Sequence, residues 1–204
     1  MSEMIYQPDH PADTTDALIM AGSGPEPPFD SVMQAFLNES HLGLKRQCER
    51  GGLLRFASLG RIHPWLFRLT FQTRGFIRNT AGEVTPVDRH VVALRFPSDY
   101  LRHANRFAML RLVEPESGSF HPNISILGAI CVEIYPGETL VEICQSLHDL
   151  FRWRLRQYDE RDALNPAACA WGRENIDEPI DERPLFGHRL KLKWHTTKAQ
   201  GRES

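Results

Sequence analysis

Hydrophobic and polar residues alternate with a period of two in three stretches of the chain, at residues 65–71, 92–96 and 108–112. This period is typical of β-strands that bury one face. Residues 53–56 form a further short apolar run, and residues 79–82 have the composition of a turn. Because consecutive strands with short connections pair antiparallel, the pattern predicts a four-stranded antiparallel meander.

Apolar residues at spacings of three and four predict helices before and after this sheet. Asp30 is placed to cap an N-terminal helix that stops near Gly51–Gly52, with Gly43 favouring a break inside it. After the sheet, one helical stripe consists of Leu140, Ile143, Cys144, Leu147, Leu150 and Phe151. A shorter helix is expected over about residues 166–174, capped by Asn165. The pattern predicts an α+β fold with an N-terminal helix, the meander, an extended segment and C-terminal helices.

Charge divides the chain into three predicted parts. Residues 1–44 contain no Lys or Arg, and the Gly- and Pro-rich residues 22–28 cannot form regular structure. We interpret residues 1–28 as a flexible acidic extension, either a bystander tail or a docking segment for a partner or for the other chain end. Residues 29–175 form the predicted domain. Residues 176–204 form a charged tail, in which the alternating Leu190, Leu192 and Trp194 allow a short strand.

The overall composition excludes several classes of function. A formal net charge of -2 and a pI near 6.5 do not favour nucleic acid or an anionic membrane as partner. No apolar run reaches the ~18 residues of a membrane span, and the start does not resemble a secretory signal, so we expect a cytoplasmic protein. The four cysteines lack CxxC spacing, which predicts free thiols, no metal site and no disulfide.

Residues 120–131 carry the strongest candidate chemistry. The segment begins Phe-His-Pro-Asn and ends Gly-Ala-Ile-Cys, so Cys131 stands at the end of an extended stretch with a glycine hinge. A free thiol has a pKa of about 8.5, and the few per cent of thiolate at neutral pH already make a nucleophile. The alternative is a buried structural cysteine, which is our expectation for Cys48, Cys144 and Cys169.

This segment resembles the catalytic core of ubiquitin-conjugating enzymes. The motif consists of His121, Pro122 and Asn123, followed by Gly-x-Ile-Cys at residues 128–131. The blocks Phe-Pro-Ser-Asp-Tyr at 96–100 and Asp-Ala-Leu-Asn-Pro at 162–166 extend the resemblance over about residues 29–175. It implies a UBC-like fold and an enzyme that accepts a ubiquitin-like protein from an activating enzyme as a thioester on Cys131, then passes it to an amine of a protein target. It implies no metal or cofactor, because ATP is used upstream by the activating enzyme.

The resemblance also implies roles for single residues. Asn123 would stabilise the oxyanion that forms when an amine attacks the thioester, worth about 3 kcal/mol in other enzymes. Alternatively, Asn123 braces the loop through backbone contacts, and the two roles are compatible. His121 and Pro122 are expected to be structural. Asp162 would orient the incoming amine, with helix capping or a plain surface charge as the alternative.

Other residues bear on partners. Lys45, Arg46 and Arg50 suit the end of a helix dipole, and ubiquitin-conjugating enzymes use a basic first helix to contact the activating enzyme. The family's usual Trp-x-Pro after the cysteine is replaced by Tyr-Pro-Gly-Glu at 135–138, and Arg102 falls where an apolar contact for RING-type ligases is common. A core with these departures is similar to bacterial ubiquitin-conjugating-like proteins of antiphage operons, so we expect a role in antiphage defence.

Two other functions remain open from the sequence. The first is a catalytically silent UBC-like binding module within a conjugation complex, although silent members usually lack the cysteine. The second is a cysteine hydrolase, which would need a histidine within hydrogen-bond reach of Cys131. A hydrolase would also turn over simple thioesters or peptides without any partner.

Overall fold

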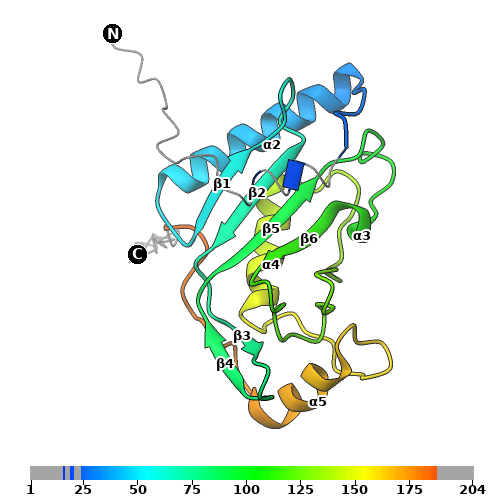
Figure 1. Cartoon of the computed structure of the whole chain (residues 1–204). Helices are drawn as coiled ribbons and strands as arrows, with labels where there is room; N and C mark the ends of the chain where they lie inside the picture. Colours follow the sequence, from blue (N-terminus) through cyan, green and yellow to red (C-terminus); the bar gives the residue numbers. More distant parts are fainter. Residues whose placement is uncertain (1–15, 17–18, 21–23, 188–204) are drawn as a thin grey trace, which may run out of the picture.

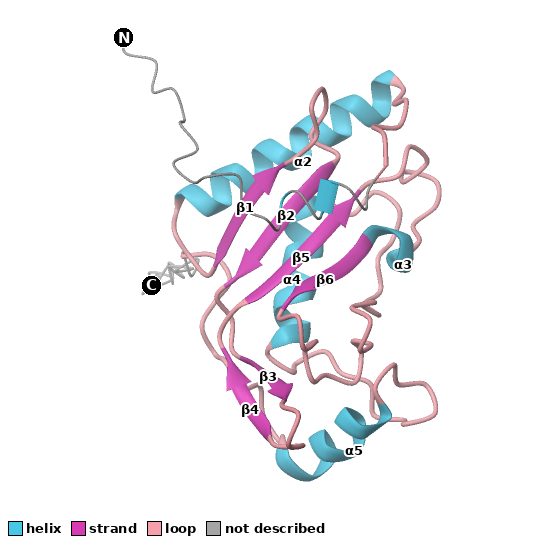
Figure 2. Ribbon diagram, in the orientation of Figure 1, coloured by secondary structure: helices cyan, strands magenta, loops and turns pink. Residues whose placement is uncertain are grey.

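The computed structural model describes residues 16, 19–20 and 24–187, and the predicted strand at 190–194 lies outside them. These residues form a four-stranded sheet, a small hairpin and several helices (Figures 1 and 2). In chain order the elements are α2 (Ser31–Glu49), β1 (Leu54–Ser58), β2 (Leu66–Phe71), β3 (Gly75–Arg78), β4 (Val84–Val87), β5 (His90–Arg95), α3 (Arg106–Met109), β6 (Leu110–Glu114), α4 (Leu140–Phe151) and α5 (Pro166–Asn175). Among these residues, no helix combines the length and apolarity that a membrane crossing requires.

The main sheet has the strand order β1-β2-β5-β6, and every neighbouring pair is antiparallel. This confirms the four-stranded antiparallel meander and the α+β class. The hairpin β3–β4 is inserted between β2 and β5, and residues 79–82 form its turn, where the Glu83 N–H donates to Asn79 Oδ1 at 2.9 Å. The alternation pattern identified the turn but missed its strands, because four residues are too few to show a period.

The sheet buries its inner face against α4 and α2 (Figure 1). The Phe71 ring of β2 lies 5.3 Å from Phe151 of α4, and the Phe67 ring lies 6.0 Å from His41 of α2. The intervening residues of β2, such as Arg68, point to the opposite face of the sheet, which we call the outer face. The hydrophobic core therefore lies on one side of the sheet, between the strands and these two helices.

Helix α2 confirms the cap at Asp30 and corrects the predicted break at Gly43. Asp30 Oδ1 accepts a hydrogen bond from the Met33 N–H at 2.8 Å. The helix then runs unbroken through Gly43 to Glu49. Leu37 and Leu44 are both fully buried against the sheet. Their burial stabilises the helix by more than the roughly 1 kcal/mol that one glycine costs.

The third predicted strand starts later than its apolar pattern indicates. Ala108 lies in the short helix α3 instead of in a strand, because Asn105 Oδ1 accepts the Phe107 N–H at 3.1 Å and caps a helical turn. Strand β6 begins only at Leu110. The expectation of strand from Ala108 onward is therefore wrong by two positions, since side-chain capping by Asn105 outweighs the local alternation.

A second hydrophobic cluster lies below the main core, between α5 and the β3–β4 hairpin. Its buried members are Phe120, Trp153, Ala168 and Ile176. The Trp153 ring lies 5.8 Å from Trp171 of α5 and 6.0 Å from Phe76 of β3. Gly172 allows this close packing, because a Cβ at that position would lie 2.2 Å from Trp153 Cζ3. The cluster fixes α5 and its preceding loop against the rest of the domain.

Residues 176–187 return along the edge of the sheet. Leu185 is buried, and its carbonyl accepts the Leu53 N–H at 2.9 Å. The Gly187 N–H donates to the Gly51 carbonyl at 2.8 Å. A Cβ at Gly52 would lie 2.2 Å from the Leu185 carbonyl oxygen, so the glycines that end α2 also admit this segment. The three-part division of the chain stays a prediction, and the described residues of its third part, 176–187, pack against the domain.

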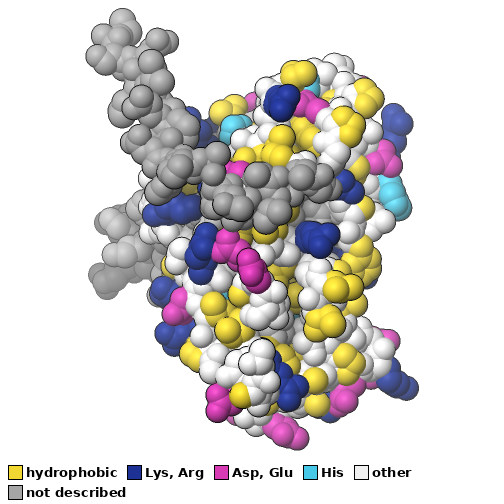
Figure 3. All heavy atoms as spheres, in the orientation of Figure 1, with side chains coloured by type: hydrophobic (Ala, Val, Ile, Leu, Met, Phe, Trp, Pro, Cys, Tyr) yellow, Lys and Arg dark blue, Asp and Glu magenta, His cyan; other side chains and the backbone are white. Residues whose placement is uncertain are grey.

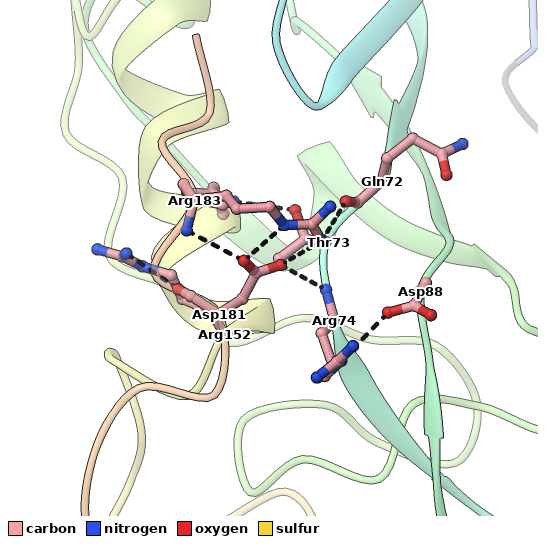
Figure 4. Close-up of polar contacts among 8 residues, drawn as sticks. Gln72, Thr73, Arg74, Asp88, Arg152, Asp181 and Arg183 are labelled. Carbon is pink, nitrogen blue, oxygen red and sulfur yellow. Dashed lines mark hydrogen bonds and ion pairs between the residues drawn. The ribbon is translucent and has the colours of Figure 1, made fainter. Parts of the chain in front are cut away.

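Asp181 anchors this segment (Figure 4). Its carboxylate accepts hydrogen bonds from the main-chain N–H groups of Arg74 (3.0 Å) and Arg183 (3.1 Å) and from the Arg183 guanidinium (2.7 Å). Burial alone would raise the pKa of the Asp181 carboxyl, but these hydrogen bonds outweigh burial and hold the pKa well below its usual range. Nearby, the Thr73 hydroxyl and His148 Nδ1 are hydrogen-bonded at 2.9 Å.

Two glycine substitutions should change stability in opposite directions. Gly43→Ala should raise the free energy of unfolding by about 0.5–1 kcal/mol, because the helical site has room and alanine restricts the unfolded chain; the nearest atom to the new Cβ is Val141 Cγ2 at 3.9 Å. Gly172→Ala should lower it by about 1–3 kcal/mol through overlap with Trp153. Urea unfolding measures both values. Destabilisation by Gly43→Ala would contradict the continuous helix.

Asp181→Asn should destabilise the protein in a pH-dependent manner. At pH 7 we expect a loss of about 2 kcal/mol, because an amide cannot accept all the charge-assisted hydrogen bonds. The folded pKa lies below the unfolded value of about 3.9, so the carboxylate stabilises the fold above that pH and the benefit falls on acidification. The difference from wild type should therefore shrink below about pH 4. Asp88→Asn is the control, since its ion pair with Arg74 is exposed and should contribute little.

Candidate active site

The motif segment folds back on itself beside β6. Ile124 and Ile130 form an antiparallel bridge, and Ala129 forms another with Arg111 of β6. The turn between the two passes requires Gly128, which has φ +82°, and a Cβ there would lie 2.6 Å from the Leu112 carbonyl oxygen. Close packing against β6 therefore fixes the segment that ends at Cys131.

Asn123 connects the two ends of this segment. Its side-chain Nδ2 donates to the Cys131 carbonyl at 2.9 Å, while the Cys131 N–H donates to the Asn123 carbonyl at 2.8 Å. Its Oδ1 accepts the Gln157 N–H at 2.7 Å. The amide thus braces both the cysteine backbone and the loop after α4. One N–H of Nδ2 is used in this brace, and the second is the group that an oxyanion role would need.

His121 and Pro122 are both buried beneath the site. His121 Nδ1 accepts the Asn123 N–H at 3.1 Å, and its ring packs against Trp153 at 4.8 Å. Burial lowers the pKa of His121 to about 3, so the imidazole is neutral at physiological pH. Among the described residues, no hydrogen bond joins a histidine to the Cys131 thiol. His121 thus packs beneath the segment, and its structural role stays a prediction.

Cys131 differs from the other cysteines in its surroundings. Cys131 is partly exposed at the end of the braced segment, Cys48 is partly exposed near the end of α2, and Cys144 and Cys169 are buried. Burial raises the pKa of the Cys48 thiol to about 11 and raises the pKa of the Cys144 and Cys169 thiols as well. Higher thiol pKa values mean less thiolate at neutral pH. Cys131, the cysteine of the braced segment, stays the candidate nucleophile that the sequence predicts.

Asp162 lies in the loop at 152–165, which contacts the motif. The loop is tied to the motif on both sides of Asp162, through the Gln157 N–H to Asn123 and through the Asn165 N–H to the Pro122 carbonyl at 3.1 Å. Asp162 itself is exposed. Within the described part of the chain, its carboxylate has no hydrogen-bond or ion-pair partner. It is therefore open to a cationic group from solvent.

The neighbouring carboxylates in this loop are already engaged. Asp159 pairs with Arg161 at 2.6 Å, and hydrogen bonds from that guanidinium lower the pKa of Asp159. Glu160 pairs with Arg173 of α5. Asp162 is thus the carboxylate of this loop that is without a partner among the described residues.

Two positions important for this geometry were missed from the sequence. Gln157 meets Asn123 through its main-chain N–H alone, so its residue type gave no signal for this contact. Its carbonyl accepts from Cys169 Sγ at 3.2 Å, and its side-chain Oε1 accepts the Tyr158 N–H at 2.8 Å within the loop. Tyr100 belongs to the Phe-Pro-Ser-Asp-Tyr block that carried part of the resemblance. Its hydroxyl donates to the carbonyls of Tyr135 (3.0 Å) and Glu138 (2.8 Å), which fixes the loop after the cysteine.

The basic residues Lys45, Arg46 and Arg50 are all exposed near the C-terminal end of α2. They lie on a different element from the Cys131 segment. The described residues contain no cluster of three or more His, Cys, Asp or Glu side chains that could hold a metal ion. The expectation of a site without metal or cofactor stays a prediction.

Substitutions of Asn123 should separate its two bracing contacts. Asn123→Ala removes both, so the Gln157 amide should exchange its proton with solvent at least about tenfold faster, corresponding to a lost hydrogen bond of about 1.4 kcal/mol. Asn123→Asp keeps an acceptor for Gln157 but places an oxygen against the Cys131 carbonyl. Its Gln157 amide should therefore stay protected. Hydrogen exchange followed by NMR measures this, and unchanged protection in Asn123→Ala would contradict the brace.

No protein-family model matches the chain, and no curated protein matches its sequence. Among solved structures, the protein is similar to S. cerevisiae Ubc12, with a TM-score of 0.50 and 15% sequence identity. The alignment covers 86% of this chain and 95% of that chain. At this level of identity the similarity concerns the fold. Together with the observed order of helix, antiparallel meander and C-terminal helices, it confirms that the chain has a UBC-like fold.

Proposed function

We propose that this protein is a ubiquitin-conjugating-type acyl carrier. Cys131 accepts the C-terminal carboxyl group of a ubiquitin-like protein from an activating enzyme and transfers it to an amine of a protein target. The observation that carries the proposal is the position of Cys131, a partly exposed thiol at the end of a segment that Asn123 braces on both sides. The position of Asp162 within the loop that Asn123 also braces supports the proposal.

The charging step is an exchange of one thioester for another. The Cys131 thiolate attacks the carbonyl carbon of the thioester on the activating enzyme, and the thiolate of that enzyme leaves. Bonds of the same type form and break, so the step requires little activation of the thiol. The absence of a histidine hydrogen-bonded to Cys131 among the described residues is compatible with this chemistry.

The transfer step forms an amide. An uncharged amine attacks the thioester carbonyl, the oxyanion collapses, and the Cys131 thiolate leaves while the amine loses a proton. Asp162 is free to hold the incoming ammonium group and to receive its proton. Asn123 supplies one N–H of Nδ2 to the oxyanion while the other remains on the Cys131 carbonyl. Both roles are part of the proposal.

The scarcity of lysine also favours a thioester carrier. Lys45 is the only lysine among the described residues, and the remaining lysines of the chain are Lys191, Lys193 and Lys198. A carrier with lysines around its active cysteine would consume its own thioester by intramolecular aminolysis. Arginine supplies most of the positive charge on this protein without that risk, because its guanidinium stays protonated.

The partners follow from the chemistry. The proposal requires a ubiquitin-like protein, an activating enzyme that uses ATP, and a protein target, and it requires neither a metal nor an organic cofactor. Lys45, Arg46 and Arg50 form an exposed basic group on α2 that would suit an acidic surface of the activating enzyme. A cytoplasmic location and a role in bacterial antiphage defence rest on the sequence resemblance alone and belong to the proposal.

A catalytically silent UBC-like binding module is the second candidate, favoured by the departures from the family pattern at 135–138. The cysteine hydrolase is disfavoured, because His121 is buried and its Nδ1 is used by the Asn123 N–H. Neither the binding module nor the hydrolase would accumulate a ubiquitin-like protein on Cys131, as a carrier would.

Charging should depend on Cys131 alone. The chain is incubated with activating enzymes, each with its own ubiquitin-like protein and ATP, and the products are compared on non-reducing and reducing gels. We expect an adduct that thiol reagents cleave. Cys131→Ala should abolish it, and Cys131→Ser should convert it to an ester that resists thiols. Cys144→Ala, which removes a buried thiol, is the control. An adduct that survives in Cys131→Ala would exclude this cysteine as the carrier.

Asp162→Asn should slow transfer without impairing charging. Discharge of a purified thioester to free lysine should fall about tenfold or more, because the carboxylate no longer holds the amine or accepts its proton. Glu160→Gln is the matched control: its carboxylate lies two residues away and already pairs with Arg173. Equal discharge rates for Asp162→Asn and wild type would remove Asp162 from the mechanism and leave the carrier role of Cys131 intact.

A further inference from the structure

Asp16 and Ile19, which precede α2, lie on the outer face of the sheet, opposite α4. We call residues 16, 19–20 and 24–29 the N-terminal strap. Asp16 forms an ion pair with Arg68 of β2, with 3.3 Å between Oδ1 and Nε, and both side chains are largely shielded from solvent. Ile19 is 5% exposed and packs with the core residues of the sheet. The acidic side chain of Asp16 and the aliphatic side chain of Ile19 thus both contact the sheet.

The other end of the strap is held at the β1–β2 loop. The Glu26 carboxylate accepts the main-chain N–H groups of His63 (2.9 Å) and Ile62 (3.2 Å). The Phe29 ring then packs edge-on against His63 at 6.0 Å, just before α2 begins. The Gly- and Pro-rich residues 21–25 connect these two attachment points. The strap is therefore attached to the domain at both ends independently.

The outer face carries charge complementary to the strap. Arg68, Ala93 and Arg111 pair in one row across β2, β5 and β6, so the two arginine side chains flank Ala93 on the same face. Arg95 follows two residues after Ala93 and therefore points the same way. Figure 3, which has the orientation of Figure 1, shows basic side chains spread over this face. The first 44 residues, in contrast, contain acidic residues and no Lys or Arg.

A groove continues beyond Ile19 on this face. It has a volume of about 680 Å³, and Ile19 forms one part of its wall together with Leu66 and Ala93. Apolar side chains at the far rim of the groove are unusually exposed: Ile126 is 81% and Leu127 is 79% exposed. Exposed apolar side chains around a groove are typical of a surface that binds another chain segment.

We propose that Asp16 and Ile19 act as an intramolecular ligand of this groove, and that an acidic segment of the type Asp-x-x-Ile competes with them for it. The carboxylate binds Arg68, and the aliphatic side chain three residues later binds between Leu66 and Ala93. When these two side chains leave, Glu26 and Phe29 keep the strap tethered nearby. The groove is thus a binding site that the protein itself covers.

The proposal is tested with a fluorescein-labelled synthetic peptide that has the sequence of residues 12–24, added to the full chain and followed by fluorescence anisotropy. In Asp16→Arg/Ile19→Asp, the resident segment is disabled while the groove is intact. If the strap occupies the groove about 90% of the time in wild type, the double variant should bind the peptide about tenfold more tightly. Binding should weaken with rising salt concentration, because the ion pair is only partly buried.

Matched variants separate this effect from a general change in charge. Val32→Asp/Glu39→Arg makes the same charge changes on exposed positions of α2 and should bind the peptide as weakly as wild type. Adding Arg68→Glu to the strap double variant should weaken binding about fivefold, the value of a typical ion pair of about 1 kcal/mol. A peptide with arginine in place of Asp16 should restore the affinity for the variant that carries Arg68→Glu. Circular dichroism melting curves check that each variant is folded.

Several results would overturn the proposal. Equal affinity of the peptide for wild type and the strap double variant would show that Asp16 and Ile19 do not cover the groove. Affinity that is unaffected by Arg68→Glu would place the peptide elsewhere, and no detectable binding to any variant would exclude a groove for such segments. Elution of wild type as a dimer, with the strap double variant monomeric, would mean that the strap passes to a second copy. None of these measurements needs an activating enzyme, so the result is independent of the proposed function.

Discussion

The candidate site depends on the side-chain amide of Asn123. Its Nδ2 holds the Cys131 carbonyl and its Oδ1 holds the Gln157 N–H, so one residue fixes both the backbone of Cys131 and the loop that contains Asp162. Few other side chains could do this, because the task needs a donor and an acceptor on one short, planar group. A partly buried hydrogen bond of this kind contributes only about 1 kcal/mol to stability. Its larger effect is to restrict the relative position of two segments that are distant in sequence.

The brace works because the structure beneath it is closely packed. His121 accepts the Asn123 N–H and packs on Trp153, which in turn lies over Gly172 of α5. This chain of contacts joins the motif to the second hydrophobic cluster without using any charged group. A neutral imidazole is well suited to such a place, since a charged one would be costly to bury. The histidine of the motif is therefore best understood as part of the packing, and the chemistry is left to the exposed groups above it.

The sequence predicted the architecture well where periods were long enough to be read. The six-residue alternation of β2 and the helical stripe of α4 identified buried faces correctly, and Asp30 and Asn165 were recognised as caps. The hairpin β3–β4 was missed because its strands have only four residues each, and α3 was missed because Asn105 overrides a local alternation. The contact of Gln157 with Asn123 could not have been found, since Gln157 makes it through its main-chain N–H. The anchoring of the 176–187 segment by Asp181 depends on long-range pairing with Arg74, which no local pattern encodes.

We propose that Cys131 carries an acyl group, and intact-mass spectrometry is a direct test of this role. The chain is incubated with an activating enzyme, its ubiquitin-like protein and ATP, in a set that charges a known conjugating enzyme in parallel, and the products are mass-analysed at mildly acidic pH without reductant. We expect one adduct per chain, with the summed mass of the two proteins minus one water, mapped to the peptide that contains Cys131 and released by thiol. An adduct on another cysteine or on a lysine, or no adduct with any set active toward its own conjugating enzyme, would contradict it.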